Sequence, residues 1–341
     1  MNEDSLYRWP AEWEPQVATW LSWPHNQRTW PGEFEPIPEV YVGWIQELTK
    51  LQNVHLVVDP DKVPSTNLDI LSDIENLSIH FWPTNDVWIR DYGPTFVKRI
   101  SDGRLAGVDW HYNAWGGKYL PFDSDARIAE LICAELDCPR NRSSMYCEGG
   151  GLETDGQGTL LTTSSCLLSD TRNPGWSRDR VEQELKHQLG VKSIVWVDGG
   201  GLEGDDTDGH IDQLARFVAP GVVVAATSSR SDDSNASGLA RNLEILQKSV
   251  DATGQPLTVH ALPTPAPRRI RNQRLPESYC NFLFVNKAVI LPTFRSRKTD
   301  EDAIRLMEQL LPNHRVIPMD AADLIYGLGA FHCASQQQPV G

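Results

Sequence analysis

Cys333 and His210 are the side chains of this sequence best suited to covalent hydrolysis near neutral pH. An ionised thiol is a strong nucleophile, and an imidazole with a pKa near 6.5 can give or accept a proton at the same pH. Cys333 stands in the segment GLGAFHCASQQQP (residues 327–339), where Gly327 and Gly329 give the backbone unusual freedom. A lone cysteine is more often an inert packed thiol, so this segment alone leaves both interpretations open.

Carboxylates surround the histidine in the segment DDTDGHIDQLARF (residues 205–217). His210 and Asp212 are two residues apart, and in an extended strand they would project from the same side. The segment therefore predicts a proton carrier that shares one face with an anion. The alternative is a metal site, whose ligands would be Asp206, Asp208, His210 and Asp212.

The segment DVWIRDYGPT (residues 86–95) places the carboxylates Asp86 and Asp91 on either side of the indole of Trp88. Such a polar mixture, ended by a Gly–Pro pair, is unusual for a core strand and indicates a turn. The alternative is purely structural, because Asp91 could pair with Arg90 or cap that turn.

Two further segments place a candidate side chain next to glycines. Trp115 in YNAWGGKY (residues 112–119) could offer a flat apolar wall that the backbone approaches closely, or could be a packed core tryptophan. Glu148 opens the run CEGGGLETDGQGTLLTT (residues 147–163), where glycines leave room for whatever it contacts. Otherwise Glu148 is a surface carboxylate.

Short apolar runs predict the strands that must position these residues. Two helices are expected between strands: one begins at Asp179 with a D-x-x-E capping box and ends at Gly190, and the other runs from Asp300 to Pro312. A strand follows each helix, which predicts an α/β fold. The predicted strands are Ala18–Trp23, Val54–Val58, Leu77–Trp82, Thr159–Thr163, Ser193–Val197, Val222–Ala226, Phe282–Val285 and Ala288–Leu291.

The sequence GGGLE occurs twice, at residues 149–153 and 199–203. A repeat predicts one supersecondary unit used several times, and a radial arrangement of such units would leave no open sheet edges. Chance similarity between two glycine-rich turns is the alternative. The longest polar stretch, residues 228–237, indicates an exposed loop rather than a linker, so we predict one domain over residues 1–341.

Charge and composition exclude several classes of partner. A net charge of −15 disfavours nucleic acid and suits a small cationic ligand, although solubility alone accounts for many such charges. No apolar run is long enough to cross a membrane, and residues 1–10 carry Asn2, Glu3 and Asp4 where a secretory signal needs basic residues, so a soluble cytoplasmic protein is expected. The six cysteines lack the spacing of a disulfide scaffold or a structural zinc site.

Seven motifs, in order along nearly the whole chain, resemble the agmatine deiminase family within the guanidine-modifying superfamily. Bacterial-type peptidylarginine deiminases share much of this pattern. The resemblance implies a pentein fold, a five-bladed propeller of ββαβ modules with pseudo-fivefold symmetry and the active site at its centre. The motifs are WPAEWEPQVATWLSWPHN (9–26), DVWIRDYGPTF (86–96), NAWGGK (113–118), EGG with DGQGTLLTT (148–150 and 155–163), DTDGHID (206–212), RLPESYCNF (274–282) and HCASQQQP (332–339).

The same resemblance implies a role for each residue of a catalytic set. Cys333 matches the nucleophile and His210 the general acid and base. Asp91 and Asp212 match the carboxylates that bind the guanidinium, and Glu148 matches the acid that orients the histidine. The separations between residues 91, 148, 210 and 333 are 57, 62 and 123 residues, about one, one and two modules if five modules share 341 residues. Anionic neighbours should also raise the thiol pKa until a cationic substrate binds.

The implied reaction is hydrolysis of agmatine to N-carbamoylputrescine and ammonia through a covalent amidino thioether, as in putrescine and polyamine metabolism, with no metal or organic cofactor. The sequence departs from the family at one point. The family more often has a GGGN-type run before the cysteine, whereas Leu328, Ala330 and Phe331 intervene here. This departure leaves the local backbone, and with it the choice of substrate, less defined.

The contacts that the protein makes with the end of the substrate away from the guanidinium should distinguish between several candidate guanidine substrates. An ammonium, as in agmatine, would favour a third acid such as Asp206 or Asp86, with Trp88 and Trp115 as further contacts. Free arginine needs a clamp for its carboxylate, and the basic run PRRIRNQR (residues 267–274), expected mainly as a solvated loop, could supply one. Peptidylarginine or free arginine is thus an alternative substrate. A non-catalytic pentein binding protein is the alternative of another class, a metal-dependent hydrolase is a third, and a homo-oligomer is left open.

Overall fold

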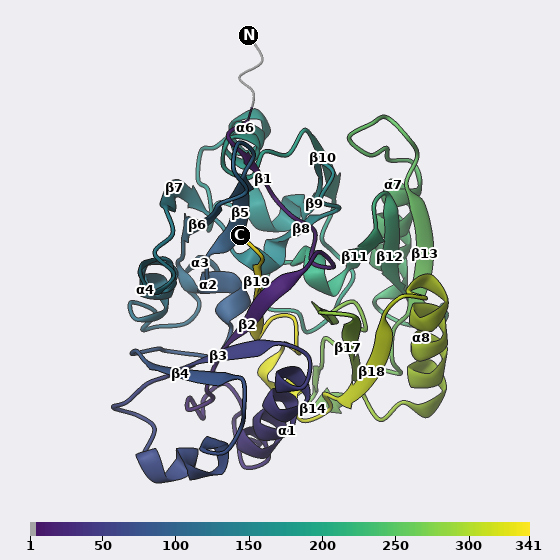
Figure 1. The fold of residues 1–341 in the computed structure, drawn as a ribbon. Coiled ribbons are helices and arrows are strands. Elements are labelled where there is room, and N and C mark those ends of the chain that lie inside the picture. The colour runs from purple at the N-terminus through teal and green to yellow at the C-terminus, as the bar shows by residue number, and fades with distance from the viewer. Residues whose placement is uncertain (1–4) are drawn as a thin grey trace.

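The computed structural model describes residues 5–341 as alternating strands and helices (Figure 1). Residues 1–4, whose composition argued against a secretory signal, lie outside the described residues. Within the described range, no helix combines the length and the apolar character that a membrane span requires.

Across residues 5–341, five sheets repeat one pattern: an antiparallel strand pair, a helix, and a third strand parallel to the second. The predicted α/β class is confirmed, because each helix crosses between parallel strands. The ββαβ units are β19 (Ser335–Pro339), β2 (Gln16–Ser22), α1 (Ile37–Thr49), β3 (Asn53–Val58); β5 (Thr95–Arg99), β6 (Leu105–His111), α4 (Ile128–Glu135), β7 (Arg140–Tyr146); β8 (Leu152–Thr154), β9 (Thr159–Thr163), α6 (Arg178–Leu189), β10 (Ser193–Val197); β11 (Ala215–Ala219), β12 (Val222–Thr227), α7 (Ala236–Gln247), β13 (Thr258–Pro263); and β16 (Leu283–Val285), β17 (Ala288–Thr293), α8 (Arg297–Leu310), β18 (Arg315–Asp320).

Shorter elements extend these units or link them. β4 (Leu77–Phe81) adds to β3, and β1 (Tyr7–Arg8) adds to β5. The remaining elements are the short helices α2 (Ile89–Tyr92), α3 (Ala114–Gly117) and α5 (Ser164–Leu167), the hairpin β14 (Arg269–Ile270) and β15 (Gln273–Arg274), and the 3-10 turns Ser65–Leu71, Asp125–Arg127, Gly149–Gly151, Ile211–Gln213 and Leu324–Gly327.

The two ends of the chain meet in one sheet. β19 pairs antiparallel with β2, so that Ser335 lies opposite Leu21 and Pro339 opposite Gln16. In Figure 1 the helices α1, α4, α6, α7 and α8 lie toward the outside of the view, whereas β19, β2 and β8 lie nearer its centre. The first unit is therefore completed only when the last strand of the chain is in place.

Buried aromatic side chains fix the segment before β19. Phe331 is wholly buried, and its ring lies 5.0 Å from that of Trp44 on α1. A large aromatic contact of this kind is worth more than its buried area alone. The packing therefore holds the backbone on either side of Cys333 against the first unit.

The predicted strands are confirmed with end shifts of at most two residues. The predicted start of α6 is wrong, because Ser177 caps the helix by accepting a backbone N–H of the first turn. Asp179 is not the cap, and the Glu182 side chain bonds instead to the indole of Trp196 at 2.9 Å. The predicted stop is confirmed, since Gly190 has a left-handed φ of 69°.

α8 begins at Arg297, three residues before the predicted Asp300. The carboxylate of Asp300 does stabilise this end, because it accepts the backbone N–H groups of Phe294 and Ser296 at 3.0 and 2.9 Å. It therefore fixes the turn that precedes the helix rather than acting as its first residue.

The two GGGLE segments adopt different conformations. Residues 149–151 form a 3-10 turn that leads into β8, whereas residues 199–203 form a loop in which Gly199 and Gly201 have φ values of 85° and 108°. The GGGLE similarity is therefore not the structural repeat. The repeat lies in the ββαβ connectivity instead.

The predicted site residues lie in segments that link one unit to the next. Asp91 lies between β4 and β5, Glu148 between β7 and β8, and His210 and Asp212 between β10 and β11. Cys333 lies between β18 and β19. Residues that are far apart in the sequence thus occupy equivalent places in successive units.

Candidate active site

The thiol of Cys333 lies beside an amide and a carboxylate from other units. Asn281, in the segment between β15 and β16, donates its Nδ2 to the sulfur at 3.0 Å and accepts the backbone N–H of Cys333 at 3.3 Å. The sulfur in turn lies 3.3 Å from Oδ2 of Asp212. Gly329 is required nearby, because a Cβ there would lie 2.5 Å from the ring of Trp88 and 3.0 Å from Cβ of Cys333.

Asp212 is wholly buried and has one oxygen without a partner. Its Oδ2 is held by His332 Nδ1 at 2.8 Å and by Asn281 Nδ2 at 3.3 Å. Its Oδ1 has no hydrogen-bond partner among the residues that the structure describes. A buried carboxylate oxygen normally has a partner, so Oδ1 is available to an N–H group of a ligand.

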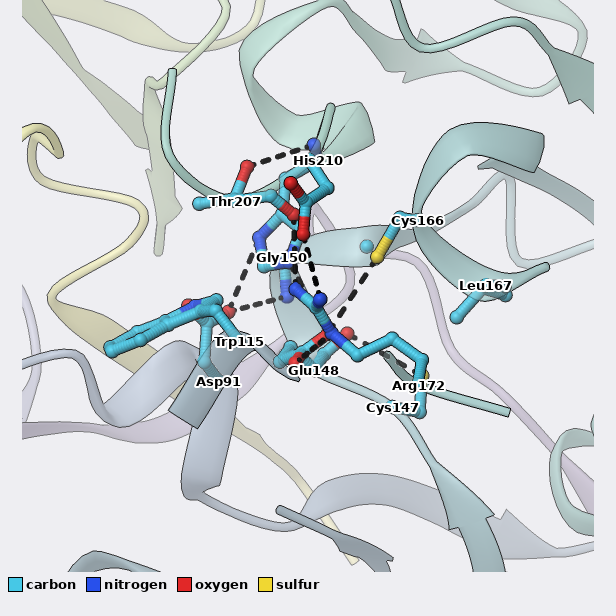
Figure 2. A network of polar contacts seen from close by, with 12 residues as sticks. Asp91, Trp115, Cys147, Glu148, Gly150, Cys166, Leu167, Arg172, Thr207 and His210 are labelled. Carbon is cyan, nitrogen blue, oxygen red and sulfur yellow. Dashed lines mark hydrogen bonds and ion pairs between the residues drawn. The ribbon is translucent and has the colours of Figure 1, made fainter. Parts of the chain in front are cut away.

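Asp91, His210 and Glu148 form a second group, which Figure 2 shows from close by. The imidazole of His210 lies between the two carboxylates, with Nδ1 3.6 Å from Asp91 Oδ1 and Nε2 3.5 Å from Glu148 Oε2. Asp91 is itself fixed by the indole N–H of Trp115 at 2.9 Å and the backbone N–H of Gly150 at 2.9 Å. These contacts hold Asp91 in one orientation while leaving the imidazole between two anions.

The expected extended conformation of residues 210–212 is wrong. His210 precedes a 3-10 turn, Ile211–Gln213, and its side chain contacts Asp91 and Glu148 while Asp212 contacts Cys333. The two groups still converge at Gly150. A Cβ added there would lie 2.6 Å from His210 Nδ1 and 3.1 Å from Asp212 Oδ2, so a larger residue would displace both.

The alternative assignment of a metal site to this segment finds no support in the geometry. Asp206 and Asp208 bind the ammonium of Lys118 at 3.2 and 2.9 Å, and Asp208 also binds Arg172 at 2.8 Å. These carboxylates are therefore neutralised at a distance from the imidazole of His210, whose neighbours are Asp91 and Glu148.

Burial and neighbouring charges shift the protonation of the site. Burial raises the pKa of the Cys333 thiol well above its ordinary value, and Asp212 and Asp91 raise it further, which is the predicted direction. Burial by itself would lower the pKa of His210, but Asp91, with Cys166 and Glu148, raises it well above its ordinary value. The empty site thus favours a neutral thiol and an imidazolium.

The pKa of Asp91 is raised to about 6, mainly by burial, because His210 only partly offsets that effect. Asp91 is therefore ionised at neutral pH and protonated in mild acid. Burial would also raise the pKa of Asp212, yet His332 and the nearby cations lower it. Two carboxylates of the site are thus anionic at pH 7.

Cys333 is among the residues that line a cavity of about 920 Å³. The cavity is large enough for a small molecule and combines aromatic walls with polar groups. His210, Glu148 and Asp212 lie behind its wall, wholly buried or nearly so. The predicted site residues that line the cavity are Asp86, Trp88, Asp91, Trp115, Asp206 and Cys333.

Comparison with known proteins agrees with this geometry. The family model for Porphyromonas-type peptidyl-arginine deiminases matches residues 8–339. The chain belongs to this family. It is 34% identical to the agmatine deiminase of Pseudomonas syringae pv. tomato, over 98% of the chain and 95% of that protein.

Solved structures of the family have the same fold. The substrate-bound C. jejuni agmatine deiminase, a cysteine-to-serine variant, superposes with a TM-score of 0.90 at 30% identity, covering 98% of this chain and 97% of that one. The agmatine deiminase of Enterococcus faecalis gives a TM-score of 0.91 at 30% identity, covering 98% and 96%. The predicted pentein fold is therefore supported.

An ion-pair network beneath the family site was not predicted from the sequence. Glu12 accepts from Arg216 at 2.6 Å, lies 3.2 Å from Arg90, and contacts His332 Nε2 at 2.6 Å. Arg90 therefore pairs with Glu12, and the alternative Arg90–Asp91 pair is wrong. Glu12 and Asn281 both lie within motifs that carry the family resemblance, WPAEWEP and RLPESYCNF, which is the signal that could have found them.

Proposed function

We propose that this chain is an agmatine deiminase, which hydrolyses the guanidinium of agmatine to a carbamoyl group and releases ammonia. The observation that carries the proposal is that a thiol, Cys333, and an anionic carboxylate, Asp91, line one cavity, while a second anionic carboxylate, Asp212, lies directly behind the thiol. The relatives named above add the substrate, because they are agmatine deiminases.

The two carboxylates fix the plane of the substrate. A guanidinium stays protonated and presents paired N–H donors that match carboxylate oxygens. Asp212 offers the free Oδ1, and Asp91 is held by Trp115 and Gly150. With the plane fixed, the Cys333 sulfur attacks the central carbon perpendicular to it.

The bound cation also activates the thiol. It compensates the charge of Asp212 and Asp91, which otherwise holds the thiol proton in place, so the proton of Cys333 passes to solvent and the thiolate forms beside its target. Attack gives a tetrahedral carbon bonded to sulfur. His210, already an imidazolium, donates its proton to the departing nitrogen, and ammonia leaves with the broken C–N bond.

Hydrolysis of the remaining amidino thioether returns the enzyme to its first state. Neutral His210 accepts a proton from water, and the resulting hydroxide bonds to the amidino carbon. The C–S bond then breaks, and the proton of the added hydroxyl passes to the departing sulfur, which leaves the neutral thiol and the carbamoyl product. Glu148 keeps the imidazole in position, because Arg172 holds Glu148 Oε1 at 2.7 Å while Oε2 faces the ring. No step in this sequence requires a cofactor.

Asp86 is the carboxylate that we assign to the distal ammonium. It lines the cavity and accepts from Thr29 Oγ1 at 2.7 Å, but no lysine or arginine of residues 5–341 forms an ion pair with it. Asp206, the other candidate, already contacts Lys118 at 3.2 Å and the hydroxyl of Tyr119. An anion without a counter-ion gains most from a cationic ligand.

The basic run favours an ammonium over a carboxylate at this end. It forms the short hairpin β14–β15, and residues 269 and 271–273 are exposed to solvent, as was expected. Arg268 binds Glu277 at 2.7 Å and the buried Arg274 binds Asp233, so both guanidinium groups are already paired. Gln273, not an arginine, is the residue of this run that lines the cavity.

The finer architecture is part of the same proposal. The five ββαβ units are arranged as five blades about a pseudo-fivefold axis, and the linking segments deliver the site residues to that axis. The chain acts as one catalytic domain in the cytoplasm. A homo-oligomer would leave the chemistry unchanged, because every residue invoked comes from one chain.

Comparison of three guanidines tests the function. We expect ammonia release from agmatine to exceed that from free arginine and from a peptidyl arginine by at least roughly 100-fold in kcat/KM, because their carboxylate or amide would face Asp86. Ammonia is measured under initial-rate conditions with each substrate. A higher value for peptidyl arginine would replace agmatine as the substrate, and no release from any guanidine would favour a binding protein.

Asp86→Asn should raise KM for agmatine by roughly 10- to 100-fold, with a smaller change in kcat. The reason is that the ammonium lies away from the reacting carbon, so its contact contributes mainly to binding. Asp206→Asn is the matched control, and an alkylguanidine without the amine is the control substrate. Equal effects of the two variants, or an equal effect on the alkylguanidine, would refute the assignment of Asp86.

A further inference from the structure

A buried cluster of three different ligand types lies next to the catalytic imidazole. Cys166 in α5 points toward Glu148, and the imidazole of His210 contacts the same carboxylate (Figure 2). One thiol, one carboxylate and one imidazole, all buried, have ligand atoms within 4.8 Å of one another. The proposed reaction uses His210 and Glu148 but has no role for the thiol.

The separations in this cluster match the edges of a tetrahedral zinc site. The Cys166 sulfur lies 3.6 Å from Glu148 Oε2, and His210 Nε2 lies 3.5 Å from the same oxygen. Zinc bonds of about 2.0–2.3 Å at tetrahedral angles place ligand atoms about 3.3–3.8 Å apart. Two of the three separations therefore fit a shared ion, and the third, between the Cys166 sulfur and His210, is within 4.8 Å.

The ring nitrogens of His210 have unused hydrogen-bonding capacity in this place. Its side chain is wholly buried, yet neither ring nitrogen has a hydrogen-bond partner within the described part of the chain. Glu148 is prepared in a different way, because Arg172 holds Oε1 at 2.7 Å and leaves Oε2 facing the cluster. An outer contact of this type orients a ligand carboxylate.

A second cluster of the same size lacks this property. Glu12, Glu153 and His332 also have ligand atoms within 4.8 Å of one another. There Arg216 binds Glu12 at 2.6 Å and Glu153 at 2.7 Å. His332 contacts Glu12 through Nε2 at 2.6 Å and Asp212 through Nδ1 at 2.8 Å. The ligand atoms of this second cluster are therefore already engaged in ion pairs and hydrogen bonds, so the cluster is an ion-pair network rather than a metal site.

We propose that Cys166, Glu148 and His210 form an inhibitory site for a thiophilic divalent cation, for which zinc is the best fit. A thiolate and an imidazole with one carboxylate suit zinc rather than magnesium or calcium. On binding, the thiol proton of Cys166 and the imidazolium proton of His210 pass to solvent, and the metal takes one bond from each ligand. Water completes the coordination.

Occupation of this site stops turnover because the ion holds Nε2 of His210. This inhibitory consequence rests on the proposed function, which assigns proton transfer to His210, whereas metal binding does not. Cys166 and His210 have no exposed surface, so an ion reaches them only after local opening. Inhibition should therefore develop slowly after zinc is added.

Cobalt provides a test of binding that is independent of activity. Cobalt bound to a thiolate has a sulfur-to-metal charge-transfer band in the near ultraviolet. We expect one equivalent of cobalt to give this band in the wild-type protein and in Cys333→Ser, and zinc to abolish it. The band should be absent from both Cys166→Ser and Cys166→Ala, the second variant guarding against a folding defect in the first.

Cys147→Ser is the matched control, because Cys147 is equally buried but its thiol contacts the backbone oxygen of Glu148. The band should survive this change. A band that depends on Cys333 or Cys147, a band that persists in the Cys166 variants, or no band in the wild type would overturn the site. If cobalt binds at Cys166 but the enzyme keeps full activity in the presence of zinc, the inhibitory role of the site is overturned. If the wild-type protein does not turn over agmatine, that result bears on the proposed function and not on metal binding.

Discussion

Cys333→Ser should lower kcat for agmatine by roughly 10⁴-fold or more while leaving agmatine binding within about tenfold of wild type. The serine hydroxyl is a far weaker nucleophile near neutral pH, and it lies beside Asp212, which opposes its ionisation further. The contacts that hold the cation come from Asp91 and Asp212 and remain. Ammonia release gives kcat, and calorimetry of the variant with agmatine gives affinity.

Cys138→Ser controls for loss of a thiol elsewhere, since Cys138 is half-buried in another unit and does not line the cavity. It should retain wild-type turnover. Thiolate absorbance adds a second measure: an inert guanidinium should increase it in the wild type and not in Cys333→Ser. Ammonia release by Cys333→Ser within about tenfold of the wild-type rate would rule out the covalent route.

Spacing along the sequence predicted the repeat of the site better than any single motif did. Residues 91, 148 and 210 follow one another at about one unit, and the next predicted residue, Cys333, comes 123 residues later, or two units. The structure places Asn281 between them, 71 residues after His210 and 52 before Cys333. The double gap therefore corresponds to a residue in the segment that links the fourth and fifth units, which the sequence analysis did not name.

Residue type explains why Asn281 was not identified. An asparagine has no pKa in the range of interest and no strong nucleophile, so a search for reactive groups passes over it. Its importance comes from geometry, since it contacts both the sulfur of Cys333 and the carboxylate of Asp212. Such a role depends on long-range packing that local patterns do not contain.

Long-range pairing limited the other predictions in the same way. Arg90 and Asp91 are neighbours in the sequence, but Arg90 binds Glu12, from the start of the chain. Arg90 also donates to Gln337 on β19, and β19 pairs with β2, the strand that follows Glu12. Ser177 rather than Asp179 caps α6, although both residue types suit that position. Local residue preferences predicted where the helices and strands lie. Contacts in the folded structure determined which of two suitable residues forms a given ion pair or cap.

The imidazole of His210 is the second residue whose loss should have a large effect. His210→Asn should lower kcat for agmatine by roughly 10²- to 10⁴-fold, because both the departure of ammonia and the attack of water need a proton carrier. Asparagine also removes the positive charge between Asp91 and Glu148. The two carboxylates are then held less firmly in position, which lowers kcat further. Initial rates of ammonia release measure the effect.

An S-alkylisothiourea separates the two proton transfers. Its thiolate leaves without protonation, so His210→Asn should still form the amidino thioether on Cys333, which then accumulates because no base activates water. Mass spectrometry of the intact protein detects the added amidino group, and His80→Gln, on β4 away from the cavity, serves as the control. Wild-type hydrolysis of the isothiourea by His210→Asn would mean that another group activates water, and the buried imidazole would then act only as a fixed charge between two carboxylates.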